Sequence, residues 1–193
     1  MQTNGEINHL NNFPDRSYTN ELNFKKIFSI IKDTKPKYKT PWESPYWAKG
    51  RSKLEKKVSK LYNKKSSSYY AYENKKFNSC IPNSILKQFN LNRKNIFIQI
   101  IKLCPGNFIP PHKDRYNNYK TKHNITKKQK VIRIWIALSN PKFGHALFLD
   151  DNVIYDIPRG GYFILPGHKL HSGVNAGVED RYFMTIDGII NGN

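Results

Sequence analysis

The feature that most constrains the fold is a change of pattern at Asn95. From this residue on, apolar residues stop recurring at helical spacing and fall into short runs rich in β-branched and aromatic residues, with Gly, Pro, Asn and Asp between the runs. Runs of this kind are typical of strands separated by turns. The second half of the chain therefore predicts eight strands: Ile96–Leu103, Phe108–Asp114, Val131–Leu138, His145–Leu149, Val153–Ile157, Tyr162–Leu165, Lys169–Ser172 and Arg181–Ile189.

Eight short strands with such turns favour a mainly β fold, namely a double-sheet jelly roll of the cupin type, also called a double-stranded β-helix. The first half differs, because its spacing predicts helices over residues 20–33, capped by Asn20, and over residues 51–62. Pro82 opens a short third helix, and residues 64–76 predict a loop. We expect the N-terminal helices to pack on the outside of one sheet and bury its apolar face.

The 193 residues suit one structural domain, in which residues 1–94 form a helical and loop elaboration and residues 95–193 form the β core. No apolar stretch approaches the roughly 20 residues of a membrane helix, and the N-terminus lacks the pattern of a secretory signal. Cys80 and Cys104 are too few for a disulfide framework. We expect a soluble protein of a reducing cytoplasm, which is the host cytoplasm for a phage-encoded chain.

Two stretches of the predicted β core carry residue types that bind metals. His112 and Asp114 are two positions apart, so on an extended strand their side chains leave the same face. His171 supplies a second imidazole from a distant strand, which completes the two-His, one-carboxylate set that holds non-haem Fe(II) and leaves coordination positions open. Arg181 follows beyond a Gly-containing turn, where a guanidinium near the metal suits bidentate binding of a carboxylate.

These residues resemble the pattern of the Fe(II)/2-oxoglutarate-dependent oxygenases. That pattern is His-x-Asp, then a distal His, then an Arg that follows the distal His at the spacing seen here between His171 and Arg181. The stretches Gly144–Leu149, His171–Gly177 and Thr185–Gly188 also look like the small phage-encoded members of that family. They are similar to aspartyl/asparaginyl β-hydroxylase domains as well. Those domains usually carry Gly where this chain has Asp114, so the nearer likeness is to the general His-x-Asp enzymes. The resemblance covers the second half of the chain and leaves the first half unexplained.

The resemblance implies Fe(II) as the metal, held by His112, Asp114 and His171, with 2-oxoglutarate and O2 as cosubstrates. It implies that 2-oxoglutarate chelates the metal through its keto and C1 carboxylate oxygens, while its distal carboxylate pairs with Arg181. The implied reaction yields succinate, carbon dioxide and an oxidant that removes hydrogen from a nearby C–H bond. His168 is the alternative distal ligand, but the offset to Arg181 favours His171.

Four further polar residues of the chain need an interpretation. Arg133 alternates with apolar residues on one face of a strand whose other face is wholly apolar. In β-hydroxylase domains the Arg of a similar Arg-x-His strand reaches the cosubstrate, so the resemblance implies that Arg133 does so here, with Trp135 in place of the His. A salt bridge at a sheet edge is the alternative. His9, His123 and His145 lack a carboxylate at ligand spacing and predict ordinary surface or loop residues.

The formal net charge of +19 has two explanations. Clustered Lys and Arg favour a polyanionic partner such as nucleic acid, but the joint abundance of Lys, Asn, Ile, Tyr and Phe is also expected from an AT-rich coding sequence. Residues 115–130 leave directly from Asp114, so this long basic loop is expected to rim the active-site mouth. There it holds an acidic protein segment, stacks on an unpaired base, or is a disordered insertion.

Together these features predict an Fe(II)- and 2-oxoglutarate-dependent dioxygenase that hydroxylates a protein side chain or another macromolecule. Two other functions remain open. One is a non-catalytic cupin-like binding or structural module, such as a viral component, which keeps the barrel without turnover. The other is an oxygenase directed at nucleic acid.

Overall fold

The computed structural model describes residues 17–37, 69–126 and 128–191 of the chain. Strands predominate from residue 97 onward, as the change of sequence pattern predicts. In chain order the elements are β1 (Ser17–Tyr18), α1 (Phe24–Asp33), β2 (Tyr69–Tyr72), the 3-10 helix η3 (Lys75–Cys80), α4 (Asn83–Gln88), β3 (Phe97–Leu103), β4 (Asn107–Phe108), α5 (Asn117–Lys122), β5 (Gln129–Ala137), β6 (His145–Leu149), β7 (Asn152–Ile154), β8 (Gly161–Leu165), β9 (His171–Asn175) and β10 (Arg181–Asn191).

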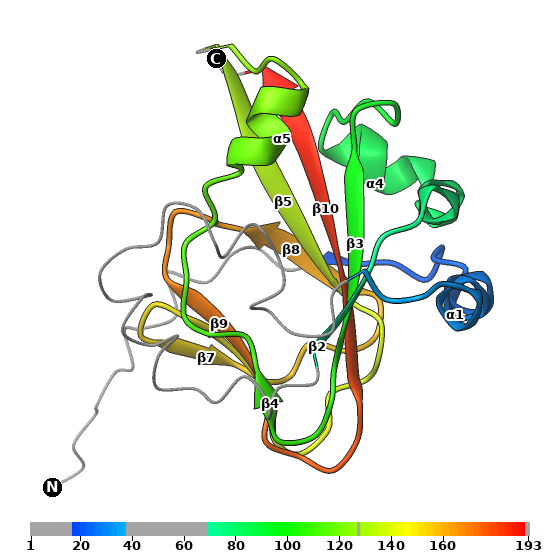
Figure 1. The fold of residues 1–193 in the computed structure, drawn as a ribbon, viewed down its shortest axis with the longest axis vertical. Coiled ribbons are helices and arrows are strands. Elements are labelled where there is room, and N and C mark those ends of the chain that lie inside the picture. The colour runs from blue at the N-terminus through cyan, green and yellow to red at the C-terminus, as the bar shows by residue number, and fades with distance from the viewer. Residues whose placement is uncertain (1–16, 38–68, 127, 192–193) are drawn as a thin grey trace, which may run out of the picture.

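The strands form two antiparallel sheets that face each other (Figure 1). One sheet has six strands in the order β1-β8-β5-β10-β3-β2, and the other has four in the order β4-β9-β6-β7. From β3 onward, the first strand pairs with the last, β10, and the second strand, β4, pairs with the second-last, β9. This nested pairing across two sheets is the connectivity of a jelly roll, so the expected double-stranded β-helix is confirmed.

Strand β5 shows why the chain builds two apolar clusters rather than one. Its side chains alternate between the two faces of the six-stranded sheet. Ile134 and Ile136 join a cluster on the outer face, whereas Trp135 and Ala137 join a cluster between the two sheets. Both faces of the strand are therefore buried, which explains why its sequence is almost continuously apolar.

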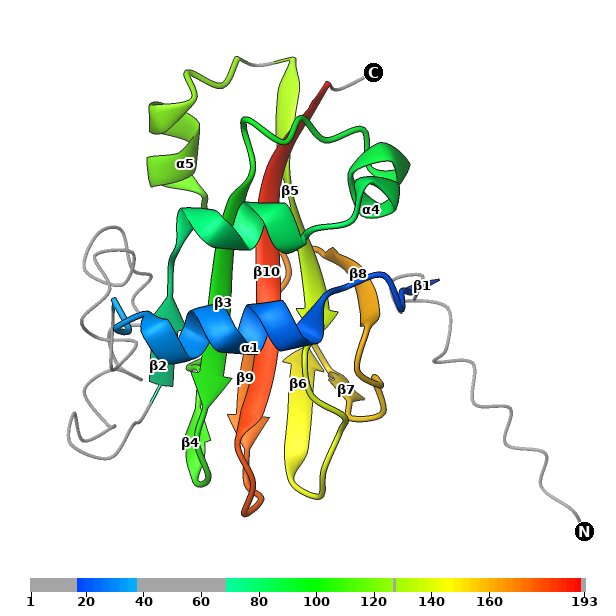
Figure 2. The same ribbon diagram turned by 90° about the vertical axis from the view of Figure 1, so that its right-hand side faces the viewer.

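Helices cover the outer face of the six-stranded sheet, as expected, and Figure 2 shows α1 running across β3, β10 and β5. Helix α1 begins after Asn23, whose side chain accepts a hydrogen bond from the Lys26 backbone N–H at 2.9 Å. Ile27, Ile30 and Ile31 lie on its buried face. Each such side chain contributes roughly 1.5–3 kcal/mol through burial, so packing rather than intrinsic propensity holds this short helix. None of the described helices is long and apolar enough to cross a membrane.

Several expected boundaries are wrong, and the most informative error concerns the strand predicted over Phe108–Asp114. Strand β4 ends at Phe108, because Pro110 and Pro111 have no N–H to donate to a neighbouring strand. Beyond them, His112 pairs with β9 as an isolated bridge. Two other predicted strands are shifted, so that β7 is Asn152–Ile154 and β9 is His171–Asn175.

Some elements were not predicted at all. Strand β2 and the start of η3 lie in the segment expected to be a loop at residues 64–76, and α5 lies within the expected long loop at residues 115–130. The predicted cap, Asn20, is wrong, since Asn23 caps α1. The helix predicted over residues 51–62 and His9 lie outside the described residues.

Candidate metal centre

His112 and His171 are brought together by direct backbone pairing. The His112 N–H donates to the His171 carbonyl and the His171 N–H donates to the His112 carbonyl, both at 2.9 Å. Residues paired in this way send their side chains to the same face, and the two imidazole centroids lie 4.3 Å apart. The Asp114 N–H donates to the Gly167 carbonyl at 2.7 Å, which continues the extended course of the chain. The carboxylate of Asp114 therefore leaves the same face as His112.

Both imidazoles are oriented by the same kind of hydrogen bond. His112 Nδ1 lies 2.8 Å from the Pro110 carbonyl, and His171 Nδ1 lies 3.0 Å from the Lys169 carbonyl. A carbonyl only accepts, so each Nδ1 carries a hydrogen, and in a neutral ring the Nε2 atom then presents a lone pair. This is the arrangement by which a backbone carbonyl fixes the tautomer and orientation of a metal-binding His.

The three side chains fit one metal ion. The Nε2 atoms of His112 and His171 lie 3.8 and 3.4 Å from the two carboxylate oxygens of Asp114. One ligand atom from each of the three residues lies within 4.8 Å of the others, so the group could hold one metal ion. Burial and the neighbouring His171 lower the pKa of His112 to about 4. The imidazole is therefore neutral near pH 7, as a metal ligand must be.

Asp114 is held in place by Arg133, whose Nη1 lies 2.8 Å from both carboxylate oxygens. The other side of the same guanidinium contacts Asp187 through Nε at 2.6 Å and Nη2 at 2.8 Å. Burial alone raises the pKa of Asp114, but Arg133 and the two imidazoles outweigh it and hold this pKa below its usual range. Arg133 therefore lies within the metal centre and fixes its carboxylate ligand. Binding of the cosubstrate by Arg133 stays a prediction.

Sequence reasoning missed Asp187, although a signal for it was present. Asp187 is the only acidic residue in the apolar run of β10, and it stands directly opposite Arg133 on β5. Burial raises its pKa from the usual value. Tyr116 was missed as well, and its ring lies under the Arg133 guanidinium at 5.2 Å. A Cβ atom at Gly167 would lie 2.2 Å from the Tyr116 hydroxyl, so this position requires glycine.

Arg181 is the fourth predicted site residue, and it is only 7% exposed. Its Nη1 donates to the carbonyls of Ala146 and Val174, and its guanidinium lies over the rings of Trp135 and Phe183. In the part of the chain that the structure describes, no carboxylate pairs with it. Burial accordingly lowers the pKa of Arg181 to about 10.

A cavity of about 70 Å³ between the two sheets connects these groups. His112, His171, Arg133 and Arg181 all line it. Gly173, on β9, lines it without a side chain, and a Cβ atom there would make only an ordinary contact at 3.5 Å. The cavity is therefore shared by the two imidazoles and by a buried cation that has no carboxylate partner among the described residues.

The remaining histidines do not join the metal cluster. His168 is exposed, so the structure agrees with His171 as the distal ligand. His123 packs against Tyr119 with ring centroids 4.5 Å apart. The expectation that His145 is an ordinary surface or loop residue is wrong, because it is 3% exposed on the inner face of β6.

No family model matches the chain, and no curated protein matches it. Solved structures do match, all at low identity. They include the cupin domain of Schizosaccharomyces pombe Cnp3, with 13% identity, TM-score 0.35, and coverage of 48% of this chain and 52% of that one. A predicted oxalate decarboxylase from Thermotoga maritima has 12% identity, TM-score 0.37, and coverage of 65% and 85%. A Cupin 2 conserved barrel domain protein from Salinispora arenicola has 17% identity, TM-score 0.34, and coverage of 49% and 63%.

The chain spans about half the length of the Schizosaccharomyces pombe domain. These likenesses concern the fold, and the strand connectivity described above already makes the chain a cupin-like module. Its chemistry must be argued from its own side chains.

Proposed function

We propose that this protein is an Fe(II)- and 2-oxoglutarate-dependent dioxygenase that hydroxylates a protein side chain or another macromolecule. One observation carries the proposal. A two-His, one-carboxylate cluster shares a cavity with Arg181, a buried cation that no described carboxylate neutralises. The cluster suits Fe(II), and the guanidinium suits the carboxylate of a small dianionic cosubstrate.

The donor set fits the metal. Two neutral imidazoles and one carboxylate on one side of an ion suit Fe(II) and leave positions for other ligands. Bound Fe(II), together with 2-oxoglutarate and O2, supplies oxidative decarboxylation coupled to C–H oxidation. His112, Asp114 and His171 hold the metal, and each has a fixing partner in the pairing described above.

Arg133 also affects how the Asp114 carboxylate meets a metal. Because its Nη1 contacts both oxygens of Asp114, one oxygen remains hydrogen-bonded when the other binds a metal. Arg133 would thereby hold the Asp114 carboxylate in a fixed orientation toward a bound metal. Asp187 holds Arg133 in this orientation through two contacts.

Arg181 is placed to bind the distal carboxylate of 2-oxoglutarate. Its guanidinium faces a cavity whose other walls are largely apolar, including Trp135, Phe183 and Leu147. In such surroundings, with little competing water, a charge-assisted hydrogen bond to a carboxylate is strong. The same apolar walls restrict water at the metal.

The test is anaerobic addition of Fe(II) and 2-oxoglutarate to the purified protein. We expect a metal-to-ligand charge-transfer band in the visible spectrum that requires both additions. Asp114→Ala is the matched control and should abolish the band while leaving Arg181 intact. A folded wild-type protein without this band refutes the proposal.

The substrate is a separate question with its own readouts. Succinate formation that depends on an added protein or nucleic acid identifies the class, and binding that weakens steeply with salt marks nucleic acid. Fe(II) binding without any consumption of 2-oxoglutarate favours the non-catalytic cupin-like module. We place the activity in a reducing compartment such as the cytoplasm, in agreement with the free thiols of Cys80 and Cys104.

A further inference from the structure

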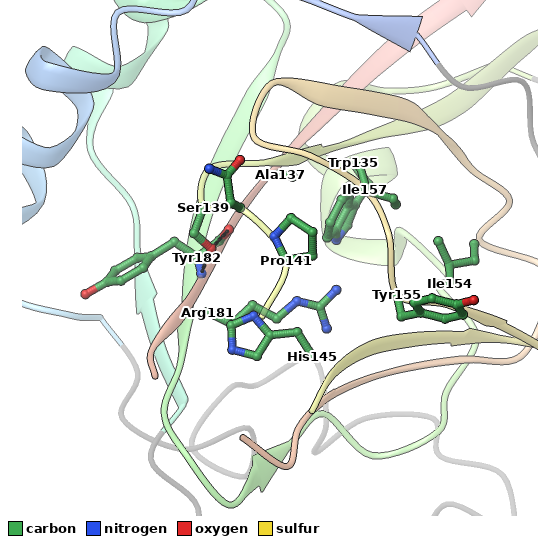
Figure 3. Close-up of a pocket in the computed structure, with 11 residues that line it drawn as sticks. Trp135, Ala137, Ser139, Pro141, His145, Ile154, Tyr155, Ile157, Arg181 and Tyr182 are labelled. Atoms are coloured by element: carbon green, nitrogen blue, oxygen red, sulfur yellow. Dashed lines mark hydrogen bonds between the residues drawn. The ribbon is translucent and has the colours of Figure 1, made fainter. Parts of the chain in front are cut away.

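Arg181 also lines a second, smaller cavity (Figure 3). Its volume is about 10 Å³, and Arg181 and Trp135 line both this cavity and the larger one. His145 and Tyr155 line only the smaller cavity. Figure 3 shows the Arg181 guanidinium extending in among the lining residues, while the Tyr155 hydroxyl points away from it.

His145 has a polar atom that nothing in the described chain satisfies. Its Nε2 lies 3.1 Å from the Glu179 carbonyl, which only accepts, so Nε2 carries the hydrogen. In the neutral ring Nδ1 is then an acceptor, and it is buried without a hydrogen-bond partner among the described residues. Buried polar atoms are nearly always hydrogen-bonded to protein or to ordered water. A buried atom without a protein partner therefore points to a bound molecule.

Arg181 offers the complementary groups. Nη1 already donates to two carbonyls, from Ala146 and Val174. Nε and Nη2 have no hydrogen-bond partner in the described part of the chain, which leaves donors that face neither carbonyl. His145 Nδ1 accepts no direct bond from them. The two side chains need a molecule that donates to one and accepts from the other.

We propose that the smaller cavity is a site for one ordered water molecule, which donates to His145 Nδ1 and accepts from the Arg181 guanidinium. A volume of about 10 Å³ matches the space that one water requires, and leaves no room for a larger ligand. The rest of the lining is mixed, with apolar residues such as Trp135 and Ile154 beside the polar residues Ser139 and Asn140.

The water gives His145 a positioning role, which rests on the function proposed above. The two carbonyls hold the Nη1 atom of the guanidinium. The water, itself bonded to His145, holds a second nitrogen of the same group. The guanidinium is thereby oriented before a carboxylate arrives in the larger cavity, which lowers the entropy lost on binding. His145 touches neither cosubstrate nor metal, so it is a positioning residue.

The first experiment needs no cosubstrate. A high-resolution crystal structure of the full chain should show a water peak within hydrogen-bonding distance of both His145 Nδ1 and an Arg181 nitrogen. Nitrogen-15 NMR should show the neutral Nε2–H tautomer of His145 with Nδ1 hydrogen-bonded. Absence of the peak, a chloride ion in its place, or an Nδ1 shift typical of a free lone pair overturns the water site.

The second experiment tests the positioning role by titrating the Fe(II)-loaded protein with 2-oxoglutarate. His145→Phe removes the acceptor and should raise the Kd for 2-oxoglutarate about tenfold while Fe(II) affinity is unchanged. His145→Asn, which keeps an oxygen near the Nδ1 position, should recover most of the affinity. Glu179 loses no essential donor in either variant, since its carbonyl also accepts from Asn175 Nδ2 at 2.8 Å.

The matched control is Tyr155→Phe, which alters the same cavity away from the guanidinium and should leave the Kd unchanged. An unchanged Kd in His145→Phe overturns the positioning role even when the water is seen. If wild-type protein binds no 2-oxoglutarate at all, the proposed function fails, whereas the crystal structure and NMR still decide the water site.

Discussion

Two arginines inside the same barrel have opposite surroundings. Arg133 lies between the carboxylates of Asp114 and Asp187, with four nitrogen–oxygen distances from 2.6 to 2.8 Å. Arg181 is more deeply buried, yet its partners among the described residues are carbonyls and aromatic faces. Their pKa values differ accordingly, since that of Arg133 is raised well above the usual value by its two carboxylates despite its burial, whereas burial lowers that of Arg181.

The two guanidinium groups differ in their partners. Arg133 is paired with carboxylates of the chain, whereas Arg181 is paired with no described carboxylate and suits an anionic ligand. A buried charge normally needs a partner of opposite sign. Arg133 has two such partners within the chain, so its charge serves the folded state and the metal carboxylate. Arg181 has none among the described residues, so its burial costs stability that an anionic ligand can return. The comparison therefore agrees with the proposal that Arg133 positions Asp114 and that Arg181 binds an anionic ligand.

The largest effect is expected from removing the paired arginine. Arg133→Met leaves Asp114 and Asp187 without their counter-charge and should destabilise the metal-free protein by about 3–4 kcal/mol. Urea unfolding followed by circular dichroism measures the change. Arg133→Met combined with Asp187→Asn is the control, and it should recover part of the loss because one stranded carboxylate becomes neutral. A single variant as stable as wild type would contradict the pairing.

The opposite result is expected for Arg181. Arg181→Met should weaken 2-oxoglutarate binding at least about a hundredfold, because it removes a charge-assisted bidentate contact in an apolar cavity. The free energy of unfolding should stay the same or rise, since an unpaired buried charge is lost. Titration of the charge-transfer band and urea unfolding measure the two quantities. Arg181→Lys, which keeps the charge without the planar geometry, should fall in between. Loss of stability equal to that of Arg133→Met would remove the distinction between the two arginines.

A smaller effect is expected from filling the space between the metal nitrogens and Arg181. Gly173→Val places two methyl groups in the cavity and touches no charged group, so it should raise the Kd for 2-oxoglutarate about tenfold with Fe(II) affinity unchanged. Gly173→Ala is the control, because a Cβ atom at this position makes only an ordinary contact with Ile109. Isothermal titration measures both affinities. Equal loss of Fe(II) and cosubstrate binding would show that the substitution acts on the fold instead.

The two arginines also show how far sequence reasoning reaches. Short apolar runs and turn residues made the double-stranded β-helix predictable, and the sequence also named His112, Asp114 and His171, which the structure brings together as a group that could hold a metal. The partners of Arg133 were not, because its contact with Asp187 depends on the register between β5 and β10, which a single sequence does not specify. The burial of His145 was missed for a similar reason, since it lies on the inner face of β6 and bonds the Glu179 carbonyl between β9 and β10, far away in the sequence.

The smallest effect concerns the charge balance around Arg133 and appears as pH dependence. The folded pKa of His112 is about 4, below its unfolded value of about 6.5, because of burial, His171 and, to a lesser extent, Arg133. The unfolded chain therefore binds more protons between these values, so stability is full above pH 6.5 and falls as pH decreases toward 4. His112 alone should account for about 1 kcal/mol between pH 6.5 and 5.5 in chelator-treated protein. Burial lowers the pKa of His145 in the same direction, so the difference between wild type and His112→Asn isolates His112. Identical pH profiles for the two proteins would mean that the imidazole is not buried beside Asp114 and Arg133 in the metal-free state.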